Sequence, residues 1–169
     1  MIESALRIMM IAHEGQIRKY NKMPYYVHPL EVANTMFQHD TGQLGYSLGL
    51  LHDAIEDCVE LDTTRLIKEL VYDGVSPFDA KILASGVESL SNIDHTDYNE
   101  KLNRAAYLPQ LTKLADIRSN TIRSGEYKTK EKLKKYARKK LQNVKVLTKI
   151  ETNHPLRLEV IEILQGHLN

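Results

Sequence analysis

LLHDAIED, residues 50–57, places a histidine and an aspartate side by side and follows them one helical turn later with two more acids. Those four residues are His52, Asp53, Glu56 and Asp57. The apolar residues of 42–55 recur at three- and four-residue intervals, which predicts a helix. On a helix of about 100° per residue, the four titratable side chains share an arc away from the apolar stripe. Taken alone, this arc is either an exposed polar surface or part of a site.

Two glycines lie beneath that arc, Gly45 and Gly49, one and two turns before the acidic residues. A glycine inside a helix costs about 0.5–1 kcal/mol relative to alanine. A purely solvated helix face would not need such residues. We therefore expect something to approach the helix backbone closely at these positions.

The same three- and four-residue period continues along most of the chain, and no segment alternates cleanly enough to predict a strand. A chain of 169 residues has the size of one ordinary domain. We predict an all-α fold, a single domain over residues 1–169 built as a bundle of about eight helices. The expected helices are 2–15, 29–39, 42–57, 62–72, 76–90, 99–123 with an interruption, 129–150 and 154–166. Pro109 should kink or restart the helix that contains it.

Composition excludes several classes of function. The chain has 23 basic and 22 acidic residues, a net charge of +1, so it carries no global field that would attract nucleic acid or a membrane. No basic segment precedes a long apolar stretch at the N-terminus, and no run of about 18 apolar residues occurs, so we expect neither a signal peptide nor a membrane span. The single cysteine, Cys58, excludes an internal disulfide and fits a reducing cytoplasm.

A basic stretch, KTKEKLKKYARKK at 128–140, raises a separate possibility. Its apolar residues recur with helical period and leave the lysines on the remaining face, so we interpret it chiefly as a solvated amphipathic helix. A rim that attracts a polyphosphate substrate and a surface for nucleic acid are the alternatives.

Two further clusters accompany the quoted stretch. His28 lies upstream in YVHP, residues 26–29, and LTKLADIRSNT, residues 111–121, lies far downstream. In the second cluster Lys113, Asp116 and Asn120 stand three and four residues apart, so a carboxylate lies between a cation and an amide on one helix face. This arrangement could place one metal ligand among phosphate-binding groups.

Four motifs occur in order along the chain: AHEGQIRK (12–19), MPYYVHPLEVA (23–33), LLHDAIED (50–57) and KLADIRSN (113–120). Together they resemble the hydrolase domain of RelA/SpoT proteins, within the HD superfamily of metal-dependent phosphohydrolases. The resemblance implies an all-helical HD domain. We expect no synthetase domain in these 169 residues, as in stand-alone small alarmone hydrolases.

The resemblance implies that four residues bind one divalent metal, Mn²⁺ in this family: His28, His52, Asp53 and Asp116. Two imidazoles and two carboxylates suit a six-coordinate ion with open positions for water and substrate. Zinc or iron would fit the same ligands, so the residue types leave the metal open.

Other residues take roles from the same resemblance. Glu56 and Asp57 match a pair that orients or deprotonates the attacking water, with a structural role as the alternative for Asp57. The nucleotide would be held by Arg18, Lys19, Asn120 and Lys113, with Lys132 and Tyr136 at its phosphates. His13 is expected to pack or to support the site rather than to bind metal.

The implied reaction is the Mn²⁺-dependent hydrolysis of the 3′-pyrophosphate of guanosine tetra- or pentaphosphate to GDP or GTP and pyrophosphate. The chain departs from the family at Ile117 and Arg118, where a basic and an apolar residue are usual, so the substrate is less fixed than the metal site. An adenine alarmone, NADPH or a nucleoside monophosphate are alternatives. A non-catalytic nucleotide sensor is another, although binding alone would not require the pair Glu56 and Asp57 beside a polyanion.

Overall fold

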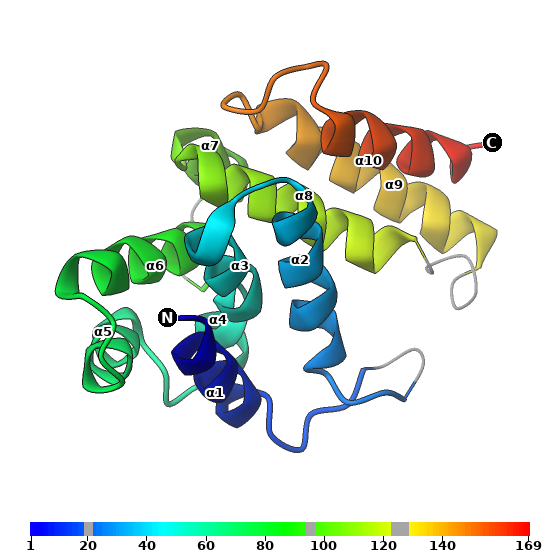
Figure 1. Cartoon of the computed structure of the whole chain (residues 1–169). Coiled ribbons are helices and arrows are strands. Elements are labelled where there is room, and N and C mark those ends of the chain that lie inside the picture. The colour runs from blue at the N-terminus through cyan, green and yellow to red at the C-terminus, as the bar shows by residue number, and fades with distance from the viewer. Residues whose placement is uncertain (19–21, 94–96, 123–128) are drawn as a thin grey trace.

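The computed structural model is a bundle of helices (Figure 1). It describes residues 1–18, 22–93, 97–122 and 129–169. The helices in these ranges are α1 (Ile2–Ala12), α2 (Val27–Gln38), α3 (Gly42–Leu51), α4 (Ala54–Asp57), α5 (Thr63–Tyr72), α6 (Pro77–Leu90), α7 (Tyr98–Arg104), α8 (Tyr107–Thr121), α9 (Lys130–Val146) and α10 (Pro155–Gly166). No strand occurs in the described residues, and the predicted all-α fold is confirmed.

Two predicted helices are each divided in the structure. The segment expected as 42–57 is broken at His52 and Asp53, between α3 and α4. The segment expected as 99–123 is interrupted at Ala105 and Ala106, between α7 and α8. Pro109 is the third residue of α8, where the missing N–H of proline removes no bond within the helix. The interruption therefore lies before the proline, which restarts the helix instead of kinking it.

Other helix ends follow their local chemistry. Asp62 and Ser76 cap α5 and α6, because their side chains accept hydrogen bonds from the backbone N–H groups of Arg65 and Asp79. The first helix is shorter than predicted and ends at Ala12. None of the helices in the described ranges is long and apolar enough to cross a membrane.

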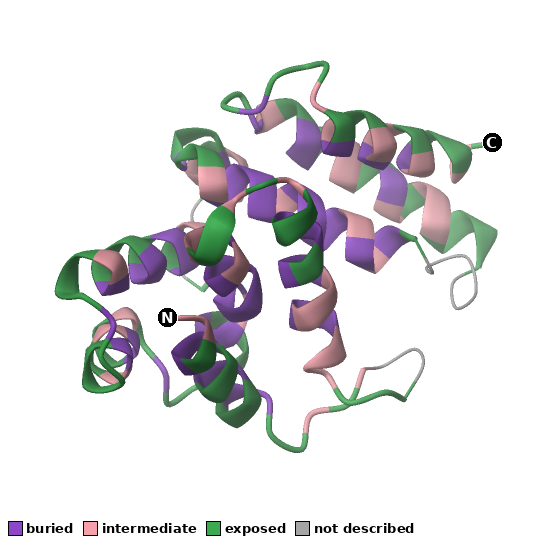
Figure 2. Cartoon of the chain, viewed as in Figure 1, coloured by how far each residue is buried: buried purple, intermediate pink, exposed green. Residues whose placement is uncertain are grey.

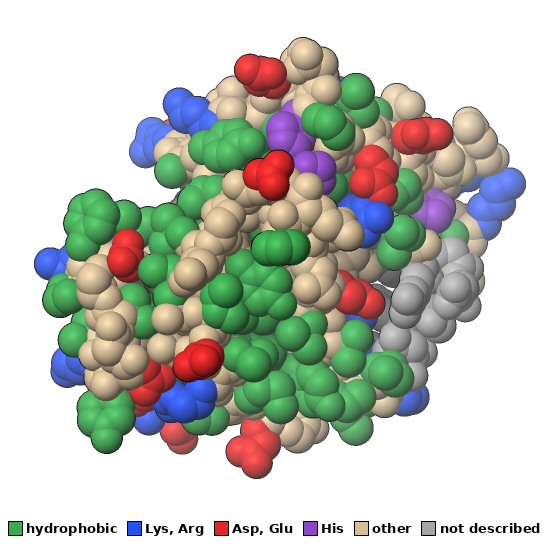
Figure 3. All heavy atoms as spheres, in the orientation of Figure 1, with side chains coloured by type: hydrophobic (Ala, Val, Ile, Leu, Met, Phe, Trp, Pro, Cys, Tyr) green, Lys and Arg blue, Asp and Glu red, His purple; other side chains and the backbone are tan. Residues whose placement is uncertain are grey.

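Helix α8 occupies the middle of the bundle, with α2 and α3 packed on one side and α10 on the other (Figure 1). Buried residues line the inner faces of these helices (Figure 2). The largest fully buried side chains include Met9, Met36, Leu51 and Leu114. Charged side chains of both signs are interspersed on the face shown in Figure 3, in keeping with the small net charge.

The close approach expected over the glycines of α3 is made by α2. A Cβ built on Gly49 would lie 2.7 Å from the Cα and 2.9 Å from the backbone N of Ala33. A Cβ on Gly45 would instead meet the side chain of Thr41. The absence of a side chain at Gly49 lets the backbones of α2 and α3 touch. This contact brings the first turn of α2, with His28, beside the end of α3, where His52 follows.

Replacement of Gly49 with alanine is expected to destabilise the protein by about 1–3 kcal/mol, because the added methyl group meets backbone atoms that cannot turn away. Urea unfolding measures the change. Gly166→Ala is the matched control, since Gly166 is also helical and a Cβ there has no neighbour within 4 Å. Equal stability of the Gly49→Ala variant and the parent would contradict the close contact of α2 and α3.

Candidate metal centre

Three parts of the bundle converge on one point. His28 is the second residue of α2, and His52 and Asp53 form the turn that separates α3 from α4. Asp116 lies in the second half of α8. His28, His52 and Asp116 are buried, at most 4% exposed, so the packing of the three parts fixes where these side chains point.

The four side chains approach one another closely. The Nε2 atoms of His28 and His52 are 3.2 Å apart, and Asp53 Oδ2 lies 3.0 Å from His52 Nε2 and 3.5 Å from His28 Nε2. Asp116 Oδ1 lies 3.3 Å from His28 Nε2 and 4.0 Å from His52 Nε2. Ligands about 2.1 Å from a six-coordinate ion lie about 3 Å from their neighbours. His28, His52 and Asp53 form a group that could hold a metal ion, and Asp116 adjoins it.

The hydrogen bonds behind the two imidazoles determine which ring nitrogens carry lone pairs. His52 Nδ1 lies 2.8 Å from the carbonyl oxygen of Gly49, which can only accept, so this nitrogen donates. The Ser119 hydroxyl donates to Glu31 Oε2 at 2.7 Å, so it accepts from His28 Nδ1 at 2.9 Å. When both rings are neutral, their Nε2 atoms present lone pairs toward each other, and without a metal the raised pKa of His28 places a proton there instead. A cation between them relieves the repulsion, so the residues present fit a metal.

The charges of the group favour a cation as well. Burial alone would raise the pKa of Asp53, but His52 and His28 hold it well below its usual range. Burial likewise opposes ionisation of Asp116, yet Lys113 and His28 keep the pKa of that carboxyl well below normal. Burial lowers the pKa of His28, but the carboxylates of Asp116 and Asp53 prevail and raise it to about 9. The pair of carboxylates therefore stays ionised and attracts positive charge to the two imidazoles.

Asp116 has the surroundings that its spacing in the sequence predicts. Lys113 Nζ lies 2.7 Å from Asp116 Oδ2, and Asn120 Nδ2 donates to Asp116 Oδ1. Lys113 Nζ also lies 5.3 Å from the centre of the Tyr98 ring. The predicted grouping of a carboxylate between a cation and an amide is confirmed. Both neighbours hold Asp116 in place, and both also face the cavity described next.

A cavity of about 270 Å³ opens over the group. It is lined by Tyr25, Asp53, Glu56, Asp57, Asn92, Tyr98, Lys113, Asp116, Asn120, Lys139, Lys140 and Asn143. The backbone N–H of Asn92 donates to Glu56 Oε2 at 3.2 Å. Burial raises the pKa of Glu56 and of Asp57, and the charge of Asp53 adds to both effects. The two carboxyls that the sequence assigned to the water thus share a cavity with Asp53 and Asp116 and are more basic than usual.

The other residues assigned to the nucleotide lie outside this cavity or outside the described residues. Arg18 pairs with Glu31 at 3.2 Å, so it lies behind Ser119 and His28. Lys132 is exposed in the first turn of α9, and Tyr136 lies one turn further along that helix. Lys19 falls outside the described residues.

The sequence assigned no individual role to six residues that line the cavity, namely Tyr25, Asn92, Tyr98, Lys139, Lys140 and Asn143. Tyr25 donates to Asp53 Oδ2 at 2.9 Å, and its ring lies 4.8 Å from that of His13. Burial and the charges of Asp53 and Asp57 raise the pKa of Tyr25, so its proton stays in place. The MPYYVH motif contained this residue, but two adjacent tyrosines gave no indication of which one faces the site. His13 is buried and packs as expected, with Nδ1 3.0 Å from Gln16 Oε1.

Three of these residues come from α9, which the sequence indicated chiefly as a solvated amphipathic helix, with a rim that attracts a polyphosphate substrate as one alternative. Lys139, Lys140 and Asn143 line the cavity. Lys140 stands three residues after buried Ala137 and four before buried Val144, so it borders the inward face. This spacing was the feature of the sequence that indicated a position for Lys140 beside the buried face of the helix.

Ser119→Ala is expected to weaken metal binding by about 10–100-fold, because the hydroxyl orients the His28 ring and fixes its tautomer. A titration of the metal-free protein with Mn²⁺ measures the effect. Ser89→Ala is the control, since Ser89 Oγ donates to the carbonyl of Gly86 in the same helix and lies outside the cavity. Unchanged Mn²⁺ affinity in Ser119→Ala would show that the hydroxyl does not position His28.

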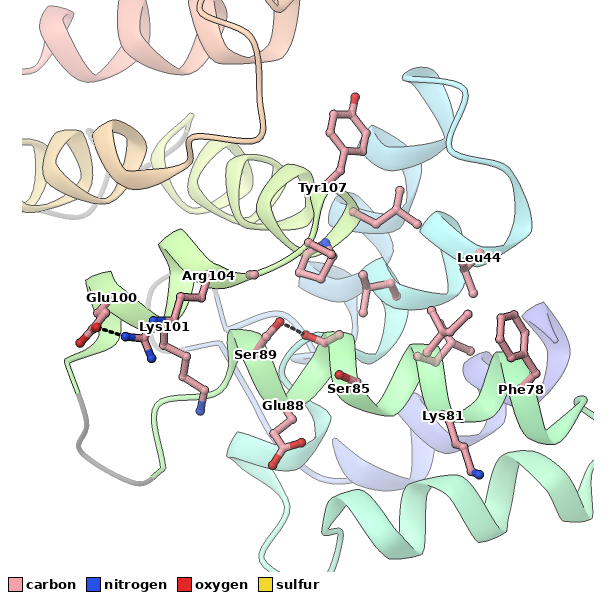
Figure 4. A pocket seen from close by; sticks show the side chains of 18 of the residues that line it. Leu44, Phe78, Lys81, Ser85, Glu88, Ser89, Glu100, Lys101, Arg104 and Tyr107 are labelled. Atoms are coloured by element: carbon pink, nitrogen blue, oxygen red, sulfur yellow. Dashed lines mark hydrogen bonds and ion pairs between the residues drawn. The ribbon is translucent and has the colours of Figure 1, made fainter.

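A larger groove, about 1060 Å³, lies between α6, α3 and the junction of α7 and α8 (Figure 4). Its floor is apolar and includes Leu48 and Pro109, while charged residues such as Lys81, Glu100 and Arg104 stand at its edge. Among the described residues, none of those assigned to the metal, the water or the nucleotide lines it. The groove is therefore separate from the group formed by His28, His52 and Asp53.

Comparisons with known proteins agree with the resemblance noted in the motifs. No family model matches the chain. A GTP pyrophosphokinase of Myxococcus xanthus is 33% identical over 136 residues, 76% of this chain and 18% of that protein. A putative chloroplastic GTP diphosphokinase of Oryza sativa subsp. japonica is 38% identical over 68 residues, 40% of this chain and 8% of that protein. The chain thus spans less than a fifth of the length of either relative.

A solved structure has the same fold over nearly the whole chain. It is a metazoan orthologue of SpoT, described as hydrolysing ppGpp and playing a role in starvation responses. The TM-score is 0.81 at 21% identity, with 99% of this chain and 96% of that chain covered. The chain is therefore similar in sequence to part of the RelA/SpoT-type proteins and has the all-helical fold of the metazoan SpoT orthologue.

Proposed function

We propose that the protein hydrolyses the 3′-pyrophosphate of guanosine tetra- or pentaphosphate, giving GDP or GTP and pyrophosphate, as a single HD-type domain. The observation that carries this proposal is the convergence of His28, His52, Asp53 and Asp116 beneath a cavity that also holds Glu56 and Asp57. Two comparisons support the choice of substrate. The chain is similar in sequence to RelA/SpoT-type proteins, and it has the fold of a solved protein that is described as hydrolysing ppGpp.

The four converging residues would hold one divalent ion, Mn²⁺ in this proposal. Two imidazole nitrogens and two carboxylate oxygens form a mixed set that leaves positions open for water and a phosphate oxygen. The bound ion supplies Lewis-acid polarisation of the phosphoryl group and lowers the pKa of water. Tyr25 and the pair Lys113 and Asn120 keep the carboxylates of Asp53 and Asp116 in position.

Glu56 is the proposed general base. Its carboxyl faces the cavity, accepts from the Asn92 N–H and has a raised pKa, so it takes up a proton from water more readily than an ordinary glutamate. Asp57 would orient the same water or assist in deprotonation. The water oxygen would attack the phosphorus attached to the ribose 3′-oxygen and break that P–O bond. Pyrophosphate would leave with the new oxygen, and the ribose 3′-oxygen would become a hydroxyl by gaining the proton that Glu56 took from the water.

The cavity is smaller than the roughly 300–1,000 Å³ of typical ligand sites, so it accommodates the reacting phosphate end of a nucleotide. We propose that Asn120 contacts the ribose or phosphate within it. Arg18 and Lys19 would contact the part of the nucleotide that extends beyond the cavity, with Lys132 and Tyr136 at its phosphates. For Arg18, this contact requires that the guanidinium either break its ion pair with Glu31 or bind the nucleotide while it keeps that pair.

A substrate panel tests the proposal against its alternatives. The Mn²⁺-loaded protein is incubated with ppGpp, pppGpp, ppApp, NADPH and dAMP, and phosphate and pyrophosphate are measured. The highest kcat/KM on ppGpp or pppGpp is expected. Turnover of another compound alone would overturn the substrate, and nucleotide binding without turnover of any compound would favour a sensor.

A further inference from the structure

The walls of the small cavity carry opposite charges. Asp53, Glu56, Asp57 and Asp116 come from the α3, α4 and α8 side, whereas Lys139 and Lys140 come from α9. A metal ion held by His28, His52, Asp53 and Asp116 would neutralise part of the acidic side. The α9 side would then remain as a separate patch of positive charge, facing the space where a substrate would lie.

The three lysines that line the cavity in the described residues are not equivalent. Lys113 is already paired with Asp116 at 2.7 Å, and this carboxylate raises its pKa despite burial. The Lys139 side chain is exposed. Lys140 is partly buried, and within the described part of the chain it makes no ion pair with a carboxylate. Its Nζ lies 5.5 Å from the centre of the Tyr136 ring, which gives only a weak cation–π contact.

A positive charge on Lys140 is electrostatically unfavourable. Burial, together with the positive charges of Lys113 and Lys139, lowers the pKa of Lys140 to about 8. The carboxylates of Asp116 and Asp53 oppose this shift only in part. The Lys140 ammonium is partly removed from water and has no carboxylate partner in the described residues, which has an electrostatic cost. An anion in the cavity would offset this cost.

We propose that Lys140 binds the distal phosphate of a diphosphate group whose proximal phosphate lies at the metal. The metal and Lys140 would then hold the two phosphates of one pyrophosphate unit from opposite walls of the cavity. The site would thereby prefer a diphosphate to a single phosphate. This inference rests on the proposed function, because a distal phosphate exists in ppGpp but not in a nucleoside monophosphate.

Binding of inorganic pyrophosphate to the Mn²⁺-loaded protein tests the inference without turnover. Lys140→Met removes the charge and keeps the unbranched side chain, and Lys140→Arg keeps the charge. Lys135→Met is the matched control, since Lys135 is exposed on α9 and does not line the cavity. Each variant is first checked for a helical content and a Mn²⁺ affinity at least equal to those of the parent. Its affinities for pyrophosphate and for orthophosphate are then measured by calorimetry.

Lys140→Met is expected to weaken pyrophosphate binding by about 10–100-fold and orthophosphate binding by less than about threefold, because a charge-assisted hydrogen bond to the distal phosphate is lost. Lys140→Arg should restore most of the pyrophosphate affinity, and Lys135→Met should behave as the parent. Unchanged pyrophosphate binding in Lys140→Met, or equal weakening of both anions, would overturn the inference.

The two proposals can fail separately. If the parent releases no pyrophosphate from ppGpp but the variants still show this pattern, the proposed function fails and Lys140 remains a diphosphate-binding residue. If the parent hydrolyses ppGpp and Lys140→Met binds pyrophosphate normally, the function stands and the role of Lys140 is wrong.

Discussion

Asp53→Ala is expected to abolish hydrolysis and to weaken Mn²⁺ binding by about 100-fold or more. Asp53 Oδ2 lies 3.0 Å from His52 Nε2 and 3.5 Å from His28 Nε2, so its loss removes both a proposed ligand and the negative charge nearest to His52. Removing one partner from a buried group of charges costs about 3–5 kcal/mol, which corresponds to this loss of affinity. Calorimetric titration with Mn²⁺ and pyrophosphate release from ppGpp measure the two effects.

Two variants make the Asp53 test specific. Asp53→Asn keeps the size of the side chain and its contact with Tyr25, so a comparable loss of Mn²⁺ affinity assigns the effect to charge. Glu151→Ala removes an exposed acid that does not line the cavity and should leave both measurements unchanged. Normal Mn²⁺ affinity in Asp53→Asn and Asp53→Ala would place the metal elsewhere.

Glu56→Gln is expected to reduce kcat by about 10²–10⁴-fold while leaving Mn²⁺ affinity within a few fold of the parent. The amide keeps the shape of the side chain and an oxygen able to accept from the Asn92 N–H, but it cannot take up a proton from water. Steady-state kinetics on ppGpp and a Mn²⁺ titration separate the two quantities.

Asp57→Asn distinguishes the roles of the two carboxyls. A loss of kcat as large as that of Glu56→Gln would assign both residues to the water, whereas a smaller loss with reduced stability would favour the structural role of Asp57. If Glu56→Gln turned over ppGpp at the parent rate, the base would have to be another group.

The sequence predicted those parts of the fold and site that depend on local spacing. The period of the apolar residues indicated the helices, and the order of the motifs singled out His28, His52, Asp53 and Asp116, which the structure brings together. The spacing of Lys113, Asp116 and Asn120 gave their mutual contacts, because residues three and four apart on a helix are neighbours.

Features that depend on packing between distant segments were beyond the sequence. The break at His52 and Asp53 arises within a segment whose apolar period is continuous, so the pattern predicted one helix. Arg18 pairs with Glu31, a residue of α2, and no local pattern specifies that pair. The spacing of Lys140 places it beside the buried face of α9, but only the packing of α9 on α7 and α10 brings that face to the cavity. The hydrogen bond from Tyr25 to Asp53 joins residues 28 positions apart for the same reason.

Manganese-dependent removal of the 3′-pyrophosphate is tested by the products formed from ppGpp when the metal-free protein is supplied with Mn²⁺. We expect equimolar GDP and pyrophosphate with Mn²⁺, and neither product with a chelator. Orthophosphate in place of pyrophosphate, or hydrolysis that persists in chelator, would contradict it.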